Sequence, residues 1–127
     1  MTTEKDLKDY AESLVLLYNK NPIFRILMVE NADKELISPT GKHLGWPDMG
    51  NTSDVGFYYD LGSAIDAVIS NEADIRETVY DAAFVLCQPP GLYETVPRQG
   101  RMFFKWDPDN EQYIPTPEPK TYDHISL

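Results

Sequence analysis

Apolar residues recur at helical spacing near the start of the chain. The stripe consists of Leu7, Tyr10, Ala11, Leu14, Leu17 and Tyr18. Because these residues lie three or four positions apart, they predict an amphipathic helix from about residue 4 to residue 19, within the N-terminal segment 1–20. Thr2 or Thr3 provides an N-cap, and Asn21-Pro22 stops the helix. We expect the stripe to pack on a sheet of the same domain, and docking onto a partner is the less common use.

Short runs of β-branched and aromatic residues predict the strands of that sheet. They cover residues 23–30, 55–59, 82–88, 101–106 and 111–114. The last two runs flank residues 107–110, whose Pro108 suits a type I turn, so they predict a β-hairpin. Ser63, followed three residues later by Asp66, predicts the N-cap of a second helix that ends near Asn71. Periodicity leaves residues 74–81 open between helical turns and an approach to the next strand.

Two segments differ from the rest in composition. Residues 31–54 are rich in glycine and proline and predict a long loop, with one short strand at Leu36-Ile37. Residues 115–127 begin with three prolines in alternate positions and predict an extended tail. The order of elements therefore predicts a single small α+β domain over residues 1–127. Its mainly antiparallel sheet would have four to five strands, with two helices packed on one face.

The middle of the chain is strongly acidic. Most of the formal net charge of −10 arises between Lys42 and Arg98, where Arg76 is the one basic residue. The acids of this stretch are Asp48, Asp54, Asp60, Asp66, Glu72, Asp74, Glu77, Asp81 and Glu94. Such a region repels nucleic acid and anionic lipid, and it attracts basic protein surfaces. We therefore expect a protein partner with a basic surface, without direct nucleic-acid or membrane binding.

Acidic residues near the C-terminus imitate the spacing of a calcium-binding loop. Asp107, Asp109, Glu111 and Glu118 occupy positions where such a loop carries carboxylates. Gln112, however, stands where the sharp turn of the loop requires glycine, so we interpret these residues as a solvated hairpin turn. No metal site and no cofactor are predicted.

The lone cysteine is a weak candidate for catalysis. Cys87 lies inside an apolar stretch, whereas a catalytic thiol needs an exposed, electropositive setting. His43 and His124 are the only histidines that could pair with it, and both are far away in sequence. We therefore expect a buried structural cysteine and predict no catalytic residue. An enzyme would require several carboxylates that converge in one deep pocket with raised pKa values.

Aromatic residues are abundant in the second half of the chain, and side-chain alternation directs about half of those in strands away from the main core. Aromatic residues in strands ordinarily pair with side chains of the neighbouring strand. Aromatic residues that do not pair in this way can anchor a binding face. Combined with the acidic stretch, they suggest one candidate interaction surface. Its residues are Asp48, Asp54, Asp60, Asp66, Trp46, Tyr58 and Trp106.

The order of several landmarks in residues 57–122 resembles a known family. These landmarks are Tyr59-Asp60, Ala64 to Val68, Asn71, Asp74-Ile75, Glu77, Tyr80, Gly91-Leu92-Tyr93, Phe104 to Asp107, Tyr113 and Glu118-Pro119. The family consists of short, acidic, uncharacterised proteins carried by gut bacteria, their phages and conjugative elements. The chain departs from it at Leu86-Cys87-Gln88 and in a shorter tail after Tyr122. The family has no established activity, so the resemblance implies a mobile-element setting and no functional residue.

Together these features predict a non-catalytic, acidic protein–protein interaction module. In a phage or mobile element, its target could be a host nucleic-acid-binding or defence protein. The alternative is a small-molecule-binding or regulatory domain with a pocket between the sheet and the 31–54 loop, lined by Trp46. The charged N-terminus lacks the apolar run of a signal peptide, and no run approaches the roughly 20 residues of a membrane span. The expected location is the cytoplasm.

Overall fold

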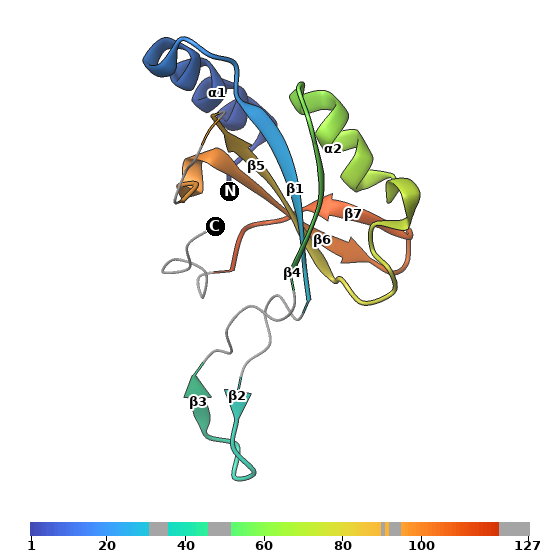
Figure 1. Ribbon diagram of the computed structural model, residues 1–127. Coiled ribbons are helices and arrows are strands. Elements are labelled where there is room, and N and C mark those ends of the chain that lie inside the picture. Colours follow the sequence, from blue (N-terminus) through green and yellow to red (C-terminus); the bar gives the residue numbers. More distant parts are fainter. Residues whose placement is uncertain (31–35, 46–51, 90, 92–94, 120–127) are drawn as a thin grey trace.

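A computed structural model of the protein describes residues 1–30, 36–45, 52–89, 91 and 95–119. Its centre is a five-stranded antiparallel sheet with the strand order β4-β1-β5-β6-β7 (Figure 1). The strands are β1 (Ile23–Val29), β4 (Thr52–Tyr58), β5 (Ala82–Gln88), β6 (Arg101–Asp107) and β7 (Gln112–Pro115). With two α-helices beside this sheet, the predicted α+β class is confirmed.

Helix α1 (Glu4–Tyr18) begins with a capping box. The Thr3 hydroxyl accepts the Asp6 N–H at 3.2 Å, and the Asp6 carboxylate accepts the Thr3 N–H at 2.9 Å. These bonds satisfy two amide groups that the first turn leaves unpaired, and they hold the pKa of Asp6 below its usual value. At the other end, Asn19 adopts the left-handed conformation with φ 54° and closes the helix.

The apolar stripe of α1 is only partly covered, which corrects one prediction. Leu7 and Leu14 are buried against the sheet, as expected. Leu17 is 72% exposed and Leu16 is 88% exposed, because the last turn of α1 projects beyond the end of the sheet (Figure 1). Helical periodicity gives the direction of a side chain, but it does not say where the underlying sheet ends.

The N-cap of helix α2 (Leu61–Ile69) lies three residues earlier than predicted. Asp60, not Ser63, is the N-cap: its carboxylate accepts the Ser63 N–H at 2.8 Å and the Ser63 hydroxyl at 2.7 Å. The prediction failed because either residue can cap a helix, and Leu61 then falls on the buried side of the first turn. No helix within the described residues is long and apolar enough to cross a membrane.

The sheet has a buried cluster on each face. The cluster on the helix side takes its strand residues from Phe24, Ile26, Met28, Ala83, Val85, Cys87, Met102, Phe104 and Tyr113. Leu7 and Leu14 of α1 and Leu61, Ala64, Ile65, Ala67 and Val68 of α2 belong to the same cluster, so both helices lie on one face. The cluster on the other face comprises Leu27, Val29, Ala82, Phe84, Leu86, Val96 and Phe103.

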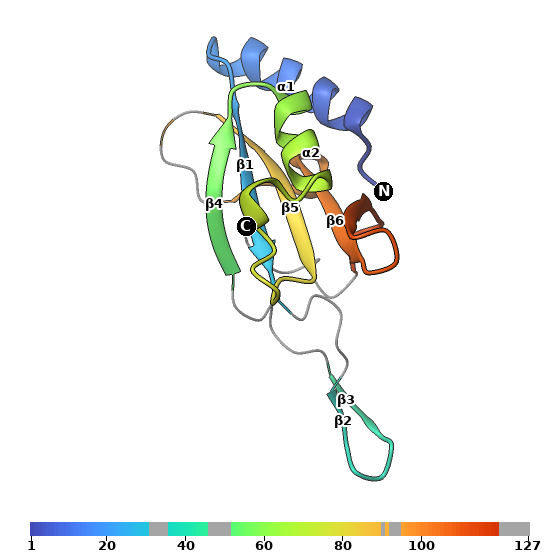
Figure 2. The same ribbon diagram turned by 90° about the vertical axis from the view of Figure 1, so that its right-hand side faces the viewer.

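The predicted loop at residues 31–54 contains more structure than expected. Strands β2 (Leu36–Ile37) and β3 (His43–Gly45) pair as an antiparallel hairpin that lies apart from the main sheet (Figures 1 and 2). β2 was predicted and β3 was not, since His43-Leu44-Gly45 contains no β-branched residue. β4 also begins at Thr52, three residues before the predicted strand, because its polar first half pairs with β1.

The segment between α2 and β5 is neither a longer helix nor an early strand. A 3₁₀ turn, η1 (Glu72–Asp74), is followed by further turns up to residue 79. Five residues of this segment have positive φ, namely Asn71, Ala73, Asp74, Glu77 and Thr78. Such left-handed residues reverse the chain within a short distance, and each costs free energy outside glycine. The reversal returns the chain to the sheet at Ala82.

The predicted hairpin at residues 107–110 is confirmed as the connection between β6 and β7. The Asp107 carboxylate accepts the Asp109 N–H at 3.0 Å and the Asn110 side-chain amide at 2.6 Å, which fixes the turn. Pro115, expected to lie outside regular structure, is the last residue of β7 and pairs with Phe104. Proline is tolerated there because β7 is an edge strand. Of the predicted tail, residues 120–127 lie outside the described part.

The contrast along α1 gives a test of the packing. We expect Leu14→Ala to lower the free energy of unfolding by about 2–5 kcal/mol, because it leaves a cavity in the core. Leu17→Ala should change this free energy by no more than about 0.5 kcal/mol, since most of the Leu17 side chain is already in water. Urea denaturation followed by circular dichroism measures both. Similar losses for the two variants would show that the last turn of α1 is covered in solution.

Candidate interaction surface

The structure describes five of the seven residues predicted for the interaction surface. Trp46 and Asp48 lie outside the described residues. The remaining five occupy four different settings: Asp54 on β4, Asp60 at the helix cap, Asp66 and Tyr58 near a groove, and Trp106 beside the core. Each must therefore be judged by its own contacts.

The charge of Asp54 is largely engaged within the domain. Asp54 lies on β4, and its Oδ1 is 3.0 Å from Nε of Arg25 on β1. The Asp54 oxygen does not lie along the N–H bond of Arg25 Nε, so the contact is an ion pair without a hydrogen bond. Nη1 of Arg25 donates to Gln88 on β5 at 3.1 Å. The three side chains link neighbouring strands, so Asp54 contributes less to an outward field than the sequence suggests.

Trp106, which was predicted as an interface anchor, is partly buried and packs against the core on the helix side. Its ring is half-buried and meets Tyr113 edge-on at a centroid distance of 5.0 Å. The guanidinium of Arg76 lies 4.4 Å from the centre of the Trp106 ring, within the range of a cation–π contact. Arg76 is the lone base of the acidic stretch, and its Nε is buried. The one basic side chain of the acidic stretch therefore packs against the Trp106 ring.

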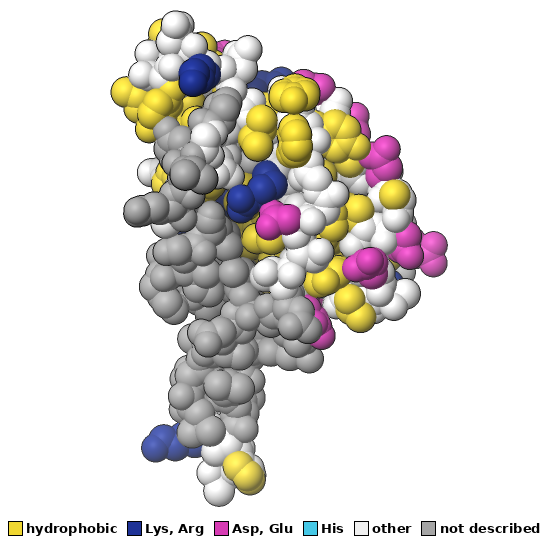
Figure 3. Space-filling view, viewed as in Figure 1, with side chains coloured by type: hydrophobic (Ala, Val, Ile, Leu, Met, Phe, Trp, Pro, Cys, Tyr) yellow, Lys and Arg dark blue, Asp and Glu magenta, His cyan; other side chains and the backbone are white. Residues whose placement is uncertain are grey.

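Four exposed carboxylates follow one another along α2 and the turns after it. We call them the acidic face: Asp66, Glu72, Asp74 and Glu77. Acidic side chains line the right-hand margin of Figure 3, where α2, the segment after it and the β6–β7 hairpin lie in Figure 1. Asp66 was predicted as part of the surface, and the other three were missed as individual residues. Their fixed outward placement results from the chain reversal at residues 71–78, which periodicity could not resolve.

A shallow groove runs between β4 and the acidic face. It consists of two adjoining cavities of about 570 Å³ and 370 Å³ that share Tyr58, Ala67 and Glu72. The Tyr58 hydroxyl donates to Oε2 of Glu72 at 2.7 Å, and this bond to an acidic partner raises the pKa of Tyr58. Asp66 also lines the groove. We call this feature the β4–α2 groove; it has an apolar floor and carboxylates on its outer wall.

The second half of β4 and the residue after it carry exposed aromatic side chains that were not selected from the sequence. Phe57 is 51% exposed and Tyr59 is 79% exposed, and their rings pack edge-on at a centroid distance of 5.5 Å. Tyr58, which was selected, points to the helix side and is half-buried. Phe57 and Tyr58 point to opposite faces of the sheet, because side chains alternate along a strand. Which of the two faces is covered depends on where the helices pack, and the strand sequence does not show this.

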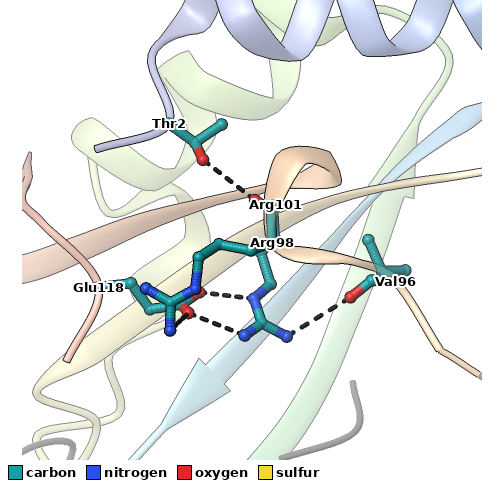
Figure 4. Close-up of polar contacts among 5 residues, drawn as sticks. All are labelled: Thr2, Val96, Arg98, Arg101 and Glu118. Carbon is teal, nitrogen blue, oxygen red and sulfur yellow. Dashed lines mark hydrogen bonds and ion pairs between the residues drawn. The ribbon is translucent and has the colours of Figure 1, made fainter. Parts of the chain in front are cut away.

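A separate polar cluster lies at the C-terminal segment (Figure 4). Arg101 binds Glu118 with two hydrogen bonds, from Nε at 2.6 Å and Nη2 at 2.8 Å, and Arg98 approaches the same carboxylate at 2.8 Å. The Arg101 and Glu118 side chains are 4% and 7% exposed. A cavity of about 460 Å³ adjoins them. Because Glu118 occupies the arginines, we interpret the cluster as a structural clasp that holds residues 116–119 to the sheet.

The structure offers little support for nucleophilic or metal chemistry in its described part. Cys87 is fully buried, and burial raises the pKa of its thiol to about 12, so it is a structural cysteine as predicted. His124 lies outside the described residues. Among the residues described, no group of three or more histidine, cysteine or carboxylate side chains could hold a metal ion. The shifted carboxyl pKa values, those of Asp6, Asp60 and Asp107, are all lowered by hydrogen bonds.

The fold and these surfaces define a small α+β domain with an acidic face, a groove and an exposed strand edge. Comparison of the chain with protein-family models, with curated proteins and with solved structures finds no match.

The clasp gives a stability prediction. We expect Glu118→Gln to lower the free energy of unfolding by about 3 kcal/mol, because the buried guanidinium of Arg101 loses a compensating charge. The matched control is Glu111→Gln in the exposed β6–β7 turn, for which we expect a change within about 0.5 kcal/mol. Urea denaturation at neutral pH compares the two. Equal stability of both variants would refute the structural role of Glu118.

The cap of α2 gives a prediction about pH. Hydrogen bonds from Ser63 lower the pKa of Asp60 in the folded state, so its stabilising contribution is present above the unfolded pKa and is lost as pH falls through the folded pKa. Asparagine caps a helix comparably but does not titrate. We therefore expect wild type to be more stable than Asp60→Asn at neutral pH, with the difference shrinking below about pH 4. Urea midpoints measured across this range test it, and a constant difference would contradict it.

Proposed function

We propose that this protein is a non-catalytic interaction module that binds a basic surface of another protein through its acidic face. The observation that carries the proposal is the arrangement around Arg76. Asp66, Glu72, Asp74 and Glu77 are exposed, while the lone base of the acidic stretch lies against Trp106. This surface presents several carboxylates to solvent, while the guanidinium of Arg76 packs on the Trp106 ring.

The physical consequence is selectivity by charge. Clustered carboxylates on a folded scaffold create a negative potential that attracts cationic surfaces and speeds their association. The same potential disfavours the phosphates of nucleic acids and anionic lipids. The acidic face is also held by the fold, since the turns at residues 71–78 fix the spacing of its carboxylates. Fixed spacing is what recognition of a particular basic surface requires.

The proposed setting is a bacterial cytoplasm in which the protein is encoded by a phage or mobile element. The resemblance of residues 57–122 to acidic proteins of such elements supports this setting. A host nucleic-acid-binding or defence protein would then be a suitable target, because its basic channel is built to receive phosphates. Carboxylates of the acidic face would occupy that channel in their place.

A matched pair of double variants tests the proposal. We expect Asp66→Asn with Glu77→Gln to lose binding, and Asp9→Asn with Glu12→Gln on α1 to retain it. Both pairs remove two exposed carboxylates, so they change the net charge equally and differ only in position. Immobilised protein would capture basic, nucleic-acid-binding proteins from a bacterial lysate at low salt. The variant of the acidic face should bind them roughly fivefold more weakly or worse.

Two further measurements make the result decisive. Rising salt should release the captured proteins, because screening weakens interactions between exposed charges. Added duplex DNA should also displace them if the acidic face occupies a phosphate-binding channel. Retention that is insensitive to salt, or equal loss for both double variants, would refute a role for this particular face.

A further inference from the structure

Strand β4 forms one edge of the main sheet, beside the β4–α2 groove. Its pairing partner is β1, and within the described residues no strand pairs with its other side. Val55, Phe57 and Tyr59 are exposed along this edge, at 38%, 51% and 79%. An edge strand offers unpaired backbone N–H and C=O groups, which an extended peptide can use to add a strand.

We propose that this edge of β4 binds an extended segment of a partner, in which basic residues alternate with apolar ones. The inference rests on the proposed function and specifies how the basic partner would be held. Successive side chains of an added strand point to opposite faces of the sheet. On the helix side they would meet Glu72 and Asp66 of the groove, which favour lysine or arginine. On the other side they would meet the exposed side chain of Phe57, which pairs with Arg25 in the ladder and favours apolar residues.

Charge decides against a second copy of this chain as the occupant. Each copy has a formal net charge of −10. Pairing β4 with β4 of another copy would bring Glu72 and Asp66 of both molecules toward the same region, where like charges repel. A basic segment instead gains from the same carboxylates.

The local backbone limits where the segment can pair. β4 contains a bulge at Val55: Gly56 pairs with Ile26 and Asp54 with Leu27, so Val55 has no partner of its own. A bulge disrupts the ladder and turns the strand away from an incoming one. The ion pair of Asp54 lies on the same first half of β4. The usable edge is therefore the second half, residues 56–59, next to the groove.

A synthetic peptide that alternates lysine with valine is the probe for this edge. Its control has the same sequence, with alternate backbone amides methylated. Methylation removes N–H donors from one edge of the peptide while leaving its charge and side chains unchanged. We expect the unmodified peptide to bind, and the methylated peptide to bind roughly tenfold more weakly or worse, because several backbone hydrogen bonds are lost. Fluorescence anisotropy at low salt measures both affinities.

Protein variants locate the binding site on one edge of the sheet. Phe57→Thr should weaken the unmodified peptide, whereas Ile114→Thr should not. Ile114 is the matched control because it is 40% exposed on β7, the opposite edge strand. Hydrogen exchange should also show new protection of the amides in residues 56–59 when the peptide is bound.

The outcomes separate this inference from the proposed function. If both peptides bind equally and Asp66→Asn with Glu77→Gln weakens both, the acidic face binds basic partners but strand addition is refuted. If neither peptide binds while the captured lysate proteins still depend on the acidic face, strand addition is likewise refuted and the proposed function stands. If the acidic-face variants have no effect on peptide or protein binding, both proposals fail.

Discussion

Strand β5 is buried on both faces, and the rest of the architecture depends on this constraint. Residues 82–87 are completely inaccessible to solvent. Because side chains alternate along a strand, each face of the sheet needs its own cover. The helices cover the side of Ala83 and Val85. On the other side, the guanidinium of Arg101 lies 5.9 Å from the centre of the Phe84 ring, and Glu118 supplies the charge that makes its burial tolerable. The clasp therefore completes the second core.

The acidic face is a consequence of the same arrangement. Since α2 packs its apolar side on the sheet, Asp66 on its other side must face water. The chain then has to return to the central position of β5, and the left-handed residues between 71 and 78 make this return within a few turns. The return exposes Glu72, Asp74 and Glu77, and it also brings Arg76 against Trp106. The fold therefore turns these carboxylates toward water and packs the guanidinium of Arg76 on the Trp106 ring.

Local sequence patterns predicted most helices and strands. Packing between elements that are distant in sequence determined which side chains are exposed. β5 and the β6–β7 hairpin were predicted because their patterns are short, strong and bounded by turn residues. On and beside β4, Tyr58 was selected from the sequence and is half-buried, whereas Phe57 and Tyr59 were not selected and are more exposed. Which face of a strand is outside depends on where the helices pack, and this is not encoded within the strand. The contact between Trp106 and Arg76 could not be predicted for the same reason, because the two residues are distant in sequence.

The two edges of the sheet are protected to different degrees, and this difference bears on the choice of binding mode. β7 is a four-residue strand that ends at Pro115, which has no N–H to donate, so it is a poor template for another strand. The first half of β4 carries a bulge and an ion pair, which protect it in another way. The second half of β4 has exposed aromatic side chains instead. Natural sheets commonly protect such edges, and this difference between the edges is the reason why the proposed partner strand is assigned to β4 and not to β7.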